Sequence, residues 1–394
     1  MTNRYILMLT LLVTGNLIGA GILGMPITTG LAGFWPSMLM MVLFALGMLF
    51  SAVVLANEAN TTQNDTFNYP SLYQKYLGTS GKWVATIANL IILYGLLTGY
   101  LAGGSQIIVN IVGIPTEFQP LVLLTLFALL TLLSISGMSV IQKYNTVLML
   151  SLWTAFFVLI FVGFEKVESA KYAYTDWGYL PMAIPMIVTG FHFHNIIPSL
   201  CKDSKWSKDI WKPIAIGMGI GFAMNTIWML VAIGVVPTFG EISLNEARVS
   251  GIPITVEMSQ ILHSQIFSII GMIFAIIAIT TSYVANGMGL KDFTEDFLKN
   301  SLNIENKWII LAVAFIPPLI LSLLFADIFL EAINIAGGIG IVLLFGILPS
   351  IIFYKKTSSK FGKIISIISL IAFSVALIIV TLQTFHILHI EPHM

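Results

Sequence analysis

Long apolar stretches separated by short polar segments run along the whole chain. A helix that crosses a bilayer needs about 20 such residues, and the alternation typical of a membrane β-barrel is not seen. The pattern predicts eleven transmembrane helices in one domain, residues 1–394. They lie at approximately 5–29, 33–56, 83–112, 118–137, 144–164, 180–200, 212–236, 262–289, 308–325, 328–353 and 363–386. We therefore expect an all-α integral membrane protein, with the lipid bilayer as its surroundings.

Composition supports this fold class. The chain is 57% hydrophobic and only 9% charged, whereas a soluble domain has about 25% charged residues. Cys201 is the single cysteine, so an internal disulfide is impossible. The formal net charge of zero argues against nucleic acid as a partner.

The basic residues predict the orientation, because cytoplasmic loops carry an excess of lysine and arginine. With a cytoplasmic N-terminus and eleven spans, only Lys166, Lys171 and Arg248 of the eighteen basic residues fall outside. We expect a multi-pass protein with its C-terminus outside. Short termini without sorting signals favour a bacterial inner membrane.

The first span is interrupted in its middle. Residues Gly15 to Pro26 read G-N-L-I-G-A-G-I-L-G-M-P, with four glycines and a proline that weaken a helix. Unwound backbone at membrane depth persists only where it lines a cavity or is buried in protein. Such breaks mark the substrate sites of secondary transporters. A glycine-rich face for helix packing is the alternative interpretation.

A second interruption lies in the sixth span, where Pro185, Gly190 and Pro198 occur within 181–200. Five spans separate the starts of the two broken spans, and an odd offset reverses their direction through the membrane. This favours an inverted repeat of five helices with one helix added. The predicted units are 5–164 and 180–353 for the two repeats and 363–386 for the additional span.

These segments carry a recognisable pattern. The segment G-N-L-I-G-A-G in span 1 resembles the unwound segment of the amino acid–polyamine–organocation superfamily, whose fold is leucine-transporter-like. The continuation I-G-A-G-I-L-G-M-P and the span-6 segment G-F-H-F-H-N-I-I-P-S-L resemble the hydroxy and aromatic amino acid permease family. The resemblance covers nearly the whole chain in the number and order of spans. It implies a leucine-transporter-like fold and cation-coupled import of aromatic or other neutral amino acids.

The substrate of such a transporter carries a carboxylate and an ammonium. Amides at the start of a half-helix donate to the carboxylate and add the positive end of a dipole. Carbonyls at the ends of other half-helices accept from the ammonium. The resemblance implies Gly19, Ala20 and Gly21 for the carboxylate, and the carbonyls of Asn16, Leu17, Val188 and Thr189 for the ammonium.

The resemblance also implies a pocket for the substrate side chain. Phe191, directly after Gly190, matches a pocket phenylalanine of the fold, and Tyr100 stands about midway along span 3, where the fold has a substrate-facing tyrosine. An aromatic residue in a span is more often a packing residue, and Tyr94 is a weaker candidate than Tyr100.

Span 8 contains a candidate ion site. Ala278, Thr281 and Ser282 reproduce the alanine, two spacers, threonine and serine of the sodium site of the fold. The carbonyls of Gly15 and Ile18 in span 1 complete the implied set. Five neutral oxygens suit a monovalent hard cation, and sodium is the expected coupling ion, with no other cofactor. The alternative is that these hydroxyls bond back to their own helix.

Proton coupling is the alternative to sodium. Many proton-coupled relatives carry a lysine in span 5, and residues 144–164 contain none, which favours sodium. His192 and His194 could still titrate. In an intact helix, positions i and i+2 face different sides, so a shared metal is not expected.

Other function classes are less consistent with the sequence. A channel has charged rings or a repeated filter motif, a receptor usually adds a soluble signalling domain, and a membrane enzyme needs clustered His, Asp, Glu or Cys. We therefore do not expect an enzyme. The outer loop 237–261, with Pro237 and Pro253, is either a lid or a solvated connector. The sequence leaves the exact substrate and the oligomeric state open.

Overall fold

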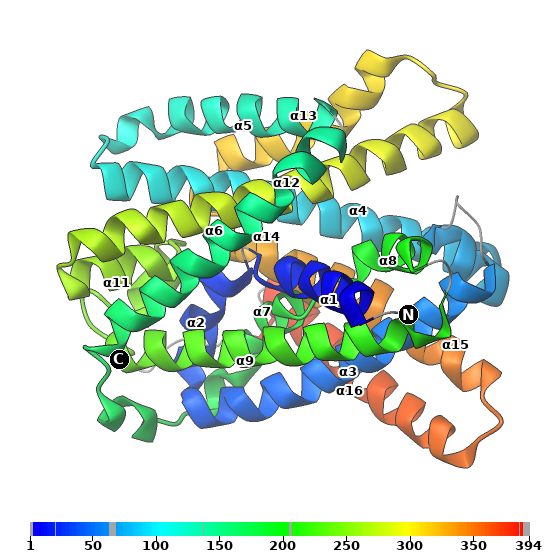
Figure 1. Ribbon diagram of the computed structural model, residues 1–394, viewed down its shortest axis with the longest axis horizontal. Coiled ribbons are helices and arrows are strands. Elements are labelled where there is room, and N and C mark those ends of the chain that lie inside the picture. Colours follow the sequence, from blue (N-terminus) through cyan, green and yellow to red (C-terminus); the bar gives the residue numbers. More distant parts are fainter. Residues whose placement is uncertain are drawn as a thin grey trace.

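The computed structural model describes residues 3–19, 21–62, 68–136, 138–204, 207–385 and 387–388. These residues form helices, turns and connecting segments without a β-strand (Figure 1). The helices of the first half are α1 Asn3–Leu17, α2 Gly21–Ala32, α3 Phe34–Thr62, α4 Tyr69–Val112, α5 Gln119–Ser136, α6 Met138–Phe164, α7 Leu180–Gly190, η4 His194–Ile196, α8 Ile197–Asp203 and α9 Trp211–Val235. Those of the second half are α10 Leu244–Val249, α11 Ile254–Leu262, α12 Gln265–Leu302, α13 Lys307–Leu324, α14 Phe329–Ile335, η6 Ala336–Ile347, α15 Leu348–Lys356 and α16 Lys360–Thr384.

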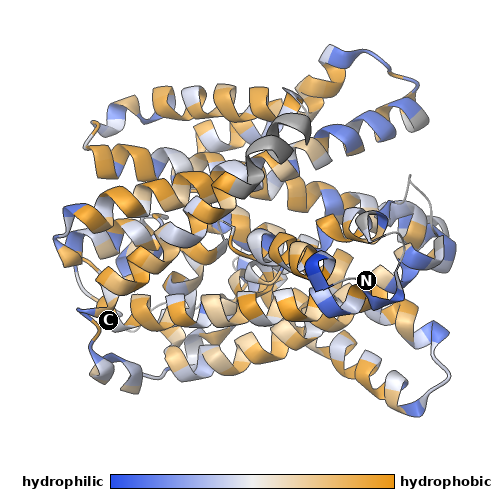
Figure 2. Cartoon of the chain, in the orientation of Figure 1, coloured by the Kyte–Doolittle hydropathy of each residue, from blue (hydrophilic) through white to orange (hydrophobic). Residues whose placement is uncertain are grey.

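The predicted number of spans is confirmed. Within the described residues, ten helical segments are long and apolar enough to cross a membrane. The pair α1 and α2, bent by 57° at its junction, makes an eleventh. Figure 2 shows apolar residues along the middle of the bundle and hydrophilic residues at its two ends, as a protein that spans a bilayer requires.

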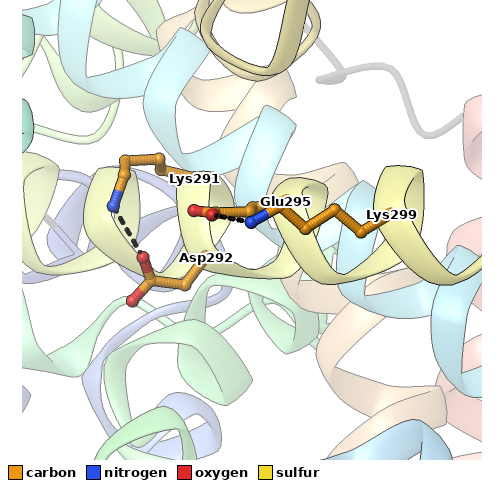
Figure 3. Close-up of polar contacts among 4 residues, drawn as sticks. All are labelled: Lys291, Asp292, Glu295 and Lys299. Atoms are coloured by element: carbon orange, nitrogen blue, oxygen red, sulfur yellow. Dashed lines mark hydrogen bonds and ion pairs between the residues drawn. The ribbon is translucent and has the colours of Figure 1, made fainter. Parts of the chain in front are cut away.

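Several helices extend beyond the predicted spans. The predicted eighth span, 262–289, ends too early, because α12 continues as a helix to Leu302. This polar extension carries two ion pairs, Lys291 with Asp292 at 2.9 Å and Lys299 with Glu295 at 2.7 Å (Figure 3). The second pair, at positions i and i+4, supports the helix. Helix α4 begins at Tyr69 instead of residue 83 and kinks at Gly78, whose φ of 69° favours glycine.

The two predicted breaks are present, but the first is shorter than expected. Helix α1 ends at Leu17 and α2 begins at Gly21, so Pro26 lies inside α2 and does not end it. In the sixth span, α7 ends at Gly190, and α8 starts at Ile197 after one turn of 3-10 helix. Figure 1 shows α2 and α7 in the middle of the bundle, and most of their residues are buried.

Pro26 is tolerated because another residue replaces its missing N–H. In an α-helix the amide of residue 26 would donate to the carbonyl of Ile22, and proline has no hydrogen to give. The indole N–H of Trp228 in α9 donates to this carbonyl instead, at 2.9 Å. Trp228 is completely buried, so a backbone oxygen deep in the protein keeps a partner.

The same arrangement recurs at other helix irregularities. Pro317 frees the carbonyl of Val313, which accepts from the hydroxyl of Tyr94 at 2.7 Å. The π-helix η6 ends at Ile347, two residues before Pro349 of α15, and the carbonyls of Phe345 and Leu344 accept from the hydroxyls of Ser51 and Tyr73. Side chains from neighbouring helices therefore satisfy the backbone where α-helical bonding is lost.

We predict that Trp228 and Pro26 are energetically coupled. Trp228→Phe should lower the free energy of unfolding by about 1–3 kcal/mol, because it leaves the buried Ile22 carbonyl without a donor. In a Pro26→Ala background, the new amide can donate to that carbonyl, and the cost of Trp228→Phe should be smaller. Unfolding of the four purified proteins in detergent gives the coupling. An equal cost in both backgrounds would contradict this account.

Candidate functional site

One cavity lies where the two broken spans meet. Its walls come from the junction of α1 and α2, the end of α7 with the segment that follows, and the facing sides of α4 and α12. The lining residues are Asn16, Leu17, Gly19, Gly21, Leu96, Tyr100, Thr189, His192, Asn195, Ser282 and Asn286. The side chains among them are neutral or, for histidine, titratable, and none is acidic, lysine or arginine.

The cavity is small in this conformation. Its volume is about 30 Å³, enough for roughly two water molecules. An aromatic amino acid is larger, so its binding requires the walls to separate.

Most of the predicted substrate residues line this cavity. They are Asn16, Leu17, Gly19, Gly21, Tyr100 and Thr189. Val188, Gly190 and Phe191 are buried next to it without lining it. Ala20 lies outside the described residues. Their roles in substrate binding stay predictions.

Neighbouring groups approach the glycines of the break closely, and at Gly19 even a Cβ would be too close to its neighbour. A Cβ added to Gly19 would lie 2.8 Å from the Ser282 Oγ, and one added to Gly21 would lie 3.4 Å from the Gly190 Cα. The two breaks therefore touch through glycine backbones. Any larger residue at Gly19 would intrude where α2 begins, at the end of the helix that presents free amides.

The carbonyls expected to hold the ammonium are partly engaged. The amide of Phe191 donates to the carbonyls of Ile187 and Val188, at 3.2 and 3.3 Å. The amide of His192 donates to the carbonyl of Thr189 at 3.1 Å. Each carbonyl has a second lone pair, so an additional donor can still bind there.

The two aromatic candidates have different surroundings. Phe191 is completely buried and stacks on Phe222 of α9, with ring centroids 5.9 Å apart. Tyr100 lines the cavity, and its hydroxyl lies within hydrogen-bonding reach of the Ser282 hydroxyl. Tyr94 points elsewhere, to the carbonyl of Val313.

The sequence interpretation missed four lining residues: Leu96, His192, Asn195 and Asn286. Two signals were available. Asn286 stands one helical turn after Ser282, and so shares its face of α12. His192 and Asn195 belong to the segment after Gly190, where unwound backbone frees side chains from helical spacing.

The two histidines of that segment lie face to face. Their rings are parallel, with centroids 5.9 Å apart, and both stack on Phe345. The expectation of different faces is wrong, because residues 191–193 are not helical. The His194 Nε2 is 3.0 Å from the Ser51 hydroxyl and 3.2 Å from the Met48 carbonyl. Among the described residues, no group of three His, Cys, Asp or Glu could hold a metal.

Of the predicted sodium residues, those of α12 reach the first break through Ser282. Ser282 lies against Gly19 of the break. The Thr281 hydroxyl donates to the carbonyls of Ile277 and Ala278, at 2.9 and 3.1 Å, as in the alternative interpretation. Its oxygen lone pairs stay available to a cation, so the chemistry of the donors fits sodium. The five predicted sodium residues would supply neutral oxygens as its ligands.

A side chain at Gly15 would point to α6. A Cβ there would lie 2.5 Å from the sulfur of Met149. The side chain that reaches the first break from the fifth span is therefore a thioether, which carries no charge and does not titrate.

The outer loop 237–261 is folded onto the bundle. It contains α10 and α11, and these helices pack against α2 and α12. Glu257 of α11 is only 2% exposed, and its Oε2 has no hydrogen-bond partner within the described residues. Burial, followed by the charge of Glu246, raises the pKa of Glu257 from 4.5 to about 7.

Comparisons with known proteins agree with this architecture. The sequence profile of the tryptophan/tyrosine permease family matches residues 2–389. The tyrosine-specific transport system 1 of Haemophilus influenzae is 30% identical over 83% of this chain and 82% of its own length. The tryptophan-specific transport protein of the same organism is 26% identical over the same shares. The crystal structure of MhsT in complex with L-phenylalanine superimposes with a TM-score of 0.61, over 95% of this chain and 97% of that one, at 15% identity. The last likeness shows a shared, leucine-transporter-like fold.

We predict that Glu257 makes the stability of the protein depend on pH. Its pKa is raised in the folded protein, so its contribution is fully present below about pH 4.5 and is lost as the pH rises to about 7. The melting temperature should therefore fall less steeply over this range in Glu257→Gln than in the wild type. Glu241→Gln, which changes an exposed carboxyl of the same loop, is the control and should follow the wild type. Parallel curves for Glu257→Gln and the wild type would exclude this role.

Proposed function

Because the chain belongs to the tryptophan/tyrosine permease family, we propose that it imports aromatic amino acids across a bacterial inner membrane by alternating access. It is a multi-pass membrane permease and not an enzyme. The relatives named for tyrosine and tryptophan transport support an aromatic substrate. The proposed orientation has a cytoplasmic N-terminus and an external C-terminus, and the unequal distribution of lysine and arginine supports it.

The cavity between the two breaks is the observation that best supports this function. A free amino acid is a zwitterion. The cavity has helix N-terminal and C-terminal ends, with partial positive and negative charges, and no acidic, lysine or arginine side chain lines it. The start of α2 presents free amides to the carboxylate, and the ends of α1 and α7 present carbonyls to the ammonium. Two broken helices that meet at a small, neutral cavity favour a transporter over a channel or a receptor.

Sodium is the proposed coupling ion. Gly15, Ile18, Ala278, Thr281 and Ser282 offer neutral oxygens, which suit a monovalent cation. The neutral Met149 at Gly15 supports this choice, because a lysine there would supply a positive charge without an ion. The competing mechanism is proton coupling, for which His192 is the titratable side chain in the cavity.

Uptake into proteoliposomes tests the proposed function. Purified protein should accumulate labelled tyrosine or tryptophan when gradients are imposed. Gly19→Leu should abolish this uptake, because its side chain would enter the cavity next to Ser282. Gly219→Leu in α9 is the control: a Cβ there meets no atom within 4 Å, so uptake should persist. Wild-type uptake by folded Gly19→Leu would refute the placement of the substrate.

A second experiment separates sodium from protons. At fixed pH, replacing sodium with choline should stop uptake, and Thr281→Ala should raise the sodium concentration needed for half-maximal uptake. Moving one charge inward gains about 2.3 kcal/mol per 100 mV, so uptake of a zwitterion should generate current. Thr125→Ala is the control, since Thr125 makes the same bond back to its helix at an exposed position. Full uptake in choline that is lost with the proton gradient would establish proton coupling.

A further inference from the structure

We propose that His192, Asn195 and Asn286 form a polar subsite that selects aromatic amino acids whose ring carries a hydrogen-bond donor. The inference rests on the proposed function and specifies its substrate class. The donor is a phenolic hydroxyl or an indole N–H, so tyrosine is preferred to phenylalanine.

A chain of hydrogen bonds fixes the direction of the two amides. The Asn286 Nδ2 donates to the carbonyl of Ser282 at 2.8 Å. Its Oδ1 therefore faces Asn195 and accepts from the Asn195 Nδ2 at 3.1 Å. These two bonds fix which end of each side-chain amide is the NH₂ group, because only the NH₂ can donate a hydrogen bond. The Asn195 Oδ1 is the end of the chain and is left as an acceptor.

Two polar atoms at this subsite lack partners. The Asn195 Oδ1 and the His192 Nε2 are buried, and neither has a hydrogen-bond partner within the described residues. Both residues line the cavity, and His192 is 93% buried, since only 7% of its surface is exposed. A buried polar group without a partner is costly. A ligand that supplies the missing partner therefore gains more than one that leaves both atoms unpaired.

The position of the subsite fits the side chain of the substrate. Asn286 lies one turn along α12 from Ser282, about 6 Å further from the Gly19 contact. Asn195 likewise follows Gly190 by five residues in the sixth span. Because the Asn195 Nδ2 is bonded to the Asn286 Oδ1, both side chains lie about one turn of α12 away from Ser282, the residue that meets Gly19 at the helix ends.

The stacking of His192 holds its Nε2 in place. Its ring stacks on both His194 and Phe345, at centroid distances of 5.9 and 5.1 Å, and these two rings also stack on each other at 4.9 Å. The imidazole nitrogen can accept from a ring donor or, in the other tautomer, donate to a phenolic oxygen. A tyrosine hydroxyl can thus donate to Asn195 and accept from His192, whereas a phenyl ring satisfies neither atom.

Calorimetric binding to the purified full-length protein tests the proposal with three ligands: tyrosine, phenylalanine and O-methyltyrosine, which keeps the oxygen but lacks the donor. The wild type should bind tyrosine roughly 10- to 100-fold more tightly than the other two. His192→Phe keeps the ring stack and removes the nitrogen, and should reduce the tyrosine preference to within about threefold. Asn286→Leu, which releases the Asn195 amide, should act in the same direction.

Asn225→Leu is the matched control. Asn225 is a buried amide that donates to the carbonyl four residues before it, as Asn286 does, but it does not line the cavity. Its variant should keep the tyrosine preference. Equal binding of tyrosine and phenylalanine by the wild type overturns the subsite, whether or not the variants fold. An equal loss for all ligands in His192→Phe with an unchanged ratio also overturns it. Failure of the wild type to bind any aromatic amino acid refutes the proposed function itself.

Discussion

The demand that every backbone polar group inside a bilayer be bonded within the protein governs this structure. Eleven spans satisfy it mostly through their own helices, and the irregular positions satisfy it through side chains of neighbours. Trp228 reaches the carbonyl that Pro26 cannot serve, and Tyr94 does the same next to Pro317. The hydroxyl of Tyr69 donates to the carbonyl of His194, in the 3-10 turn between the two halves of the sixth span. These donors come from different helices, so they also fix how the broken spans sit against the bundle.

The constraint also explains how far the sequence could predict the fold. Long apolar runs and the glycines at Gly19, Gly21 and Gly190 reveal spans and breaks, because they act on the backbone locally. The extent of α12 was missed, since hydropathy falls at Lys291 although the helix continues with paired charges. Pro26 was read as a breaker because its compensating donor stands 202 positions away in the chain. Local patterns carry no information on such partners.

In the candidate site, too, backbone features were easier to predict from the sequence than side-chain contacts. Residues on the breaks were predictable from backbone chemistry, and the substrate residues predicted in span 1 line the cavity as far as they are described. Side-chain contacts were less predictable. Phe191 follows the break directly, but stacks on Phe222, because its ring turns to α9. His192 and His194 share a face because the chain between them is not helical, whereas helical spacing separates them. Where the helix stops, its periodicity no longer assigns faces.

No ionic side chain is among the cavity-lining residues, so the groups that can bind the charges of an amino acid differ from those that can distinguish its side chain. Each helix end carries roughly half a unit charge, so the ends of α1, α2 and α7 can balance a zwitterion without a fixed ion that would hold it too firmly to release. In the proposed mode of binding, these ends act on groups that all amino acids share, and therefore cannot distinguish one amino acid from another. Discrimination has to come from neutral groups further along the cavity, where an unpaired buried atom penalises the wrong side chain. Because the space between the walls is only about 30 Å³, a substrate meets both sets of groups only as the walls separate to admit it. Recognition is thereby tied to the movement that transport requires.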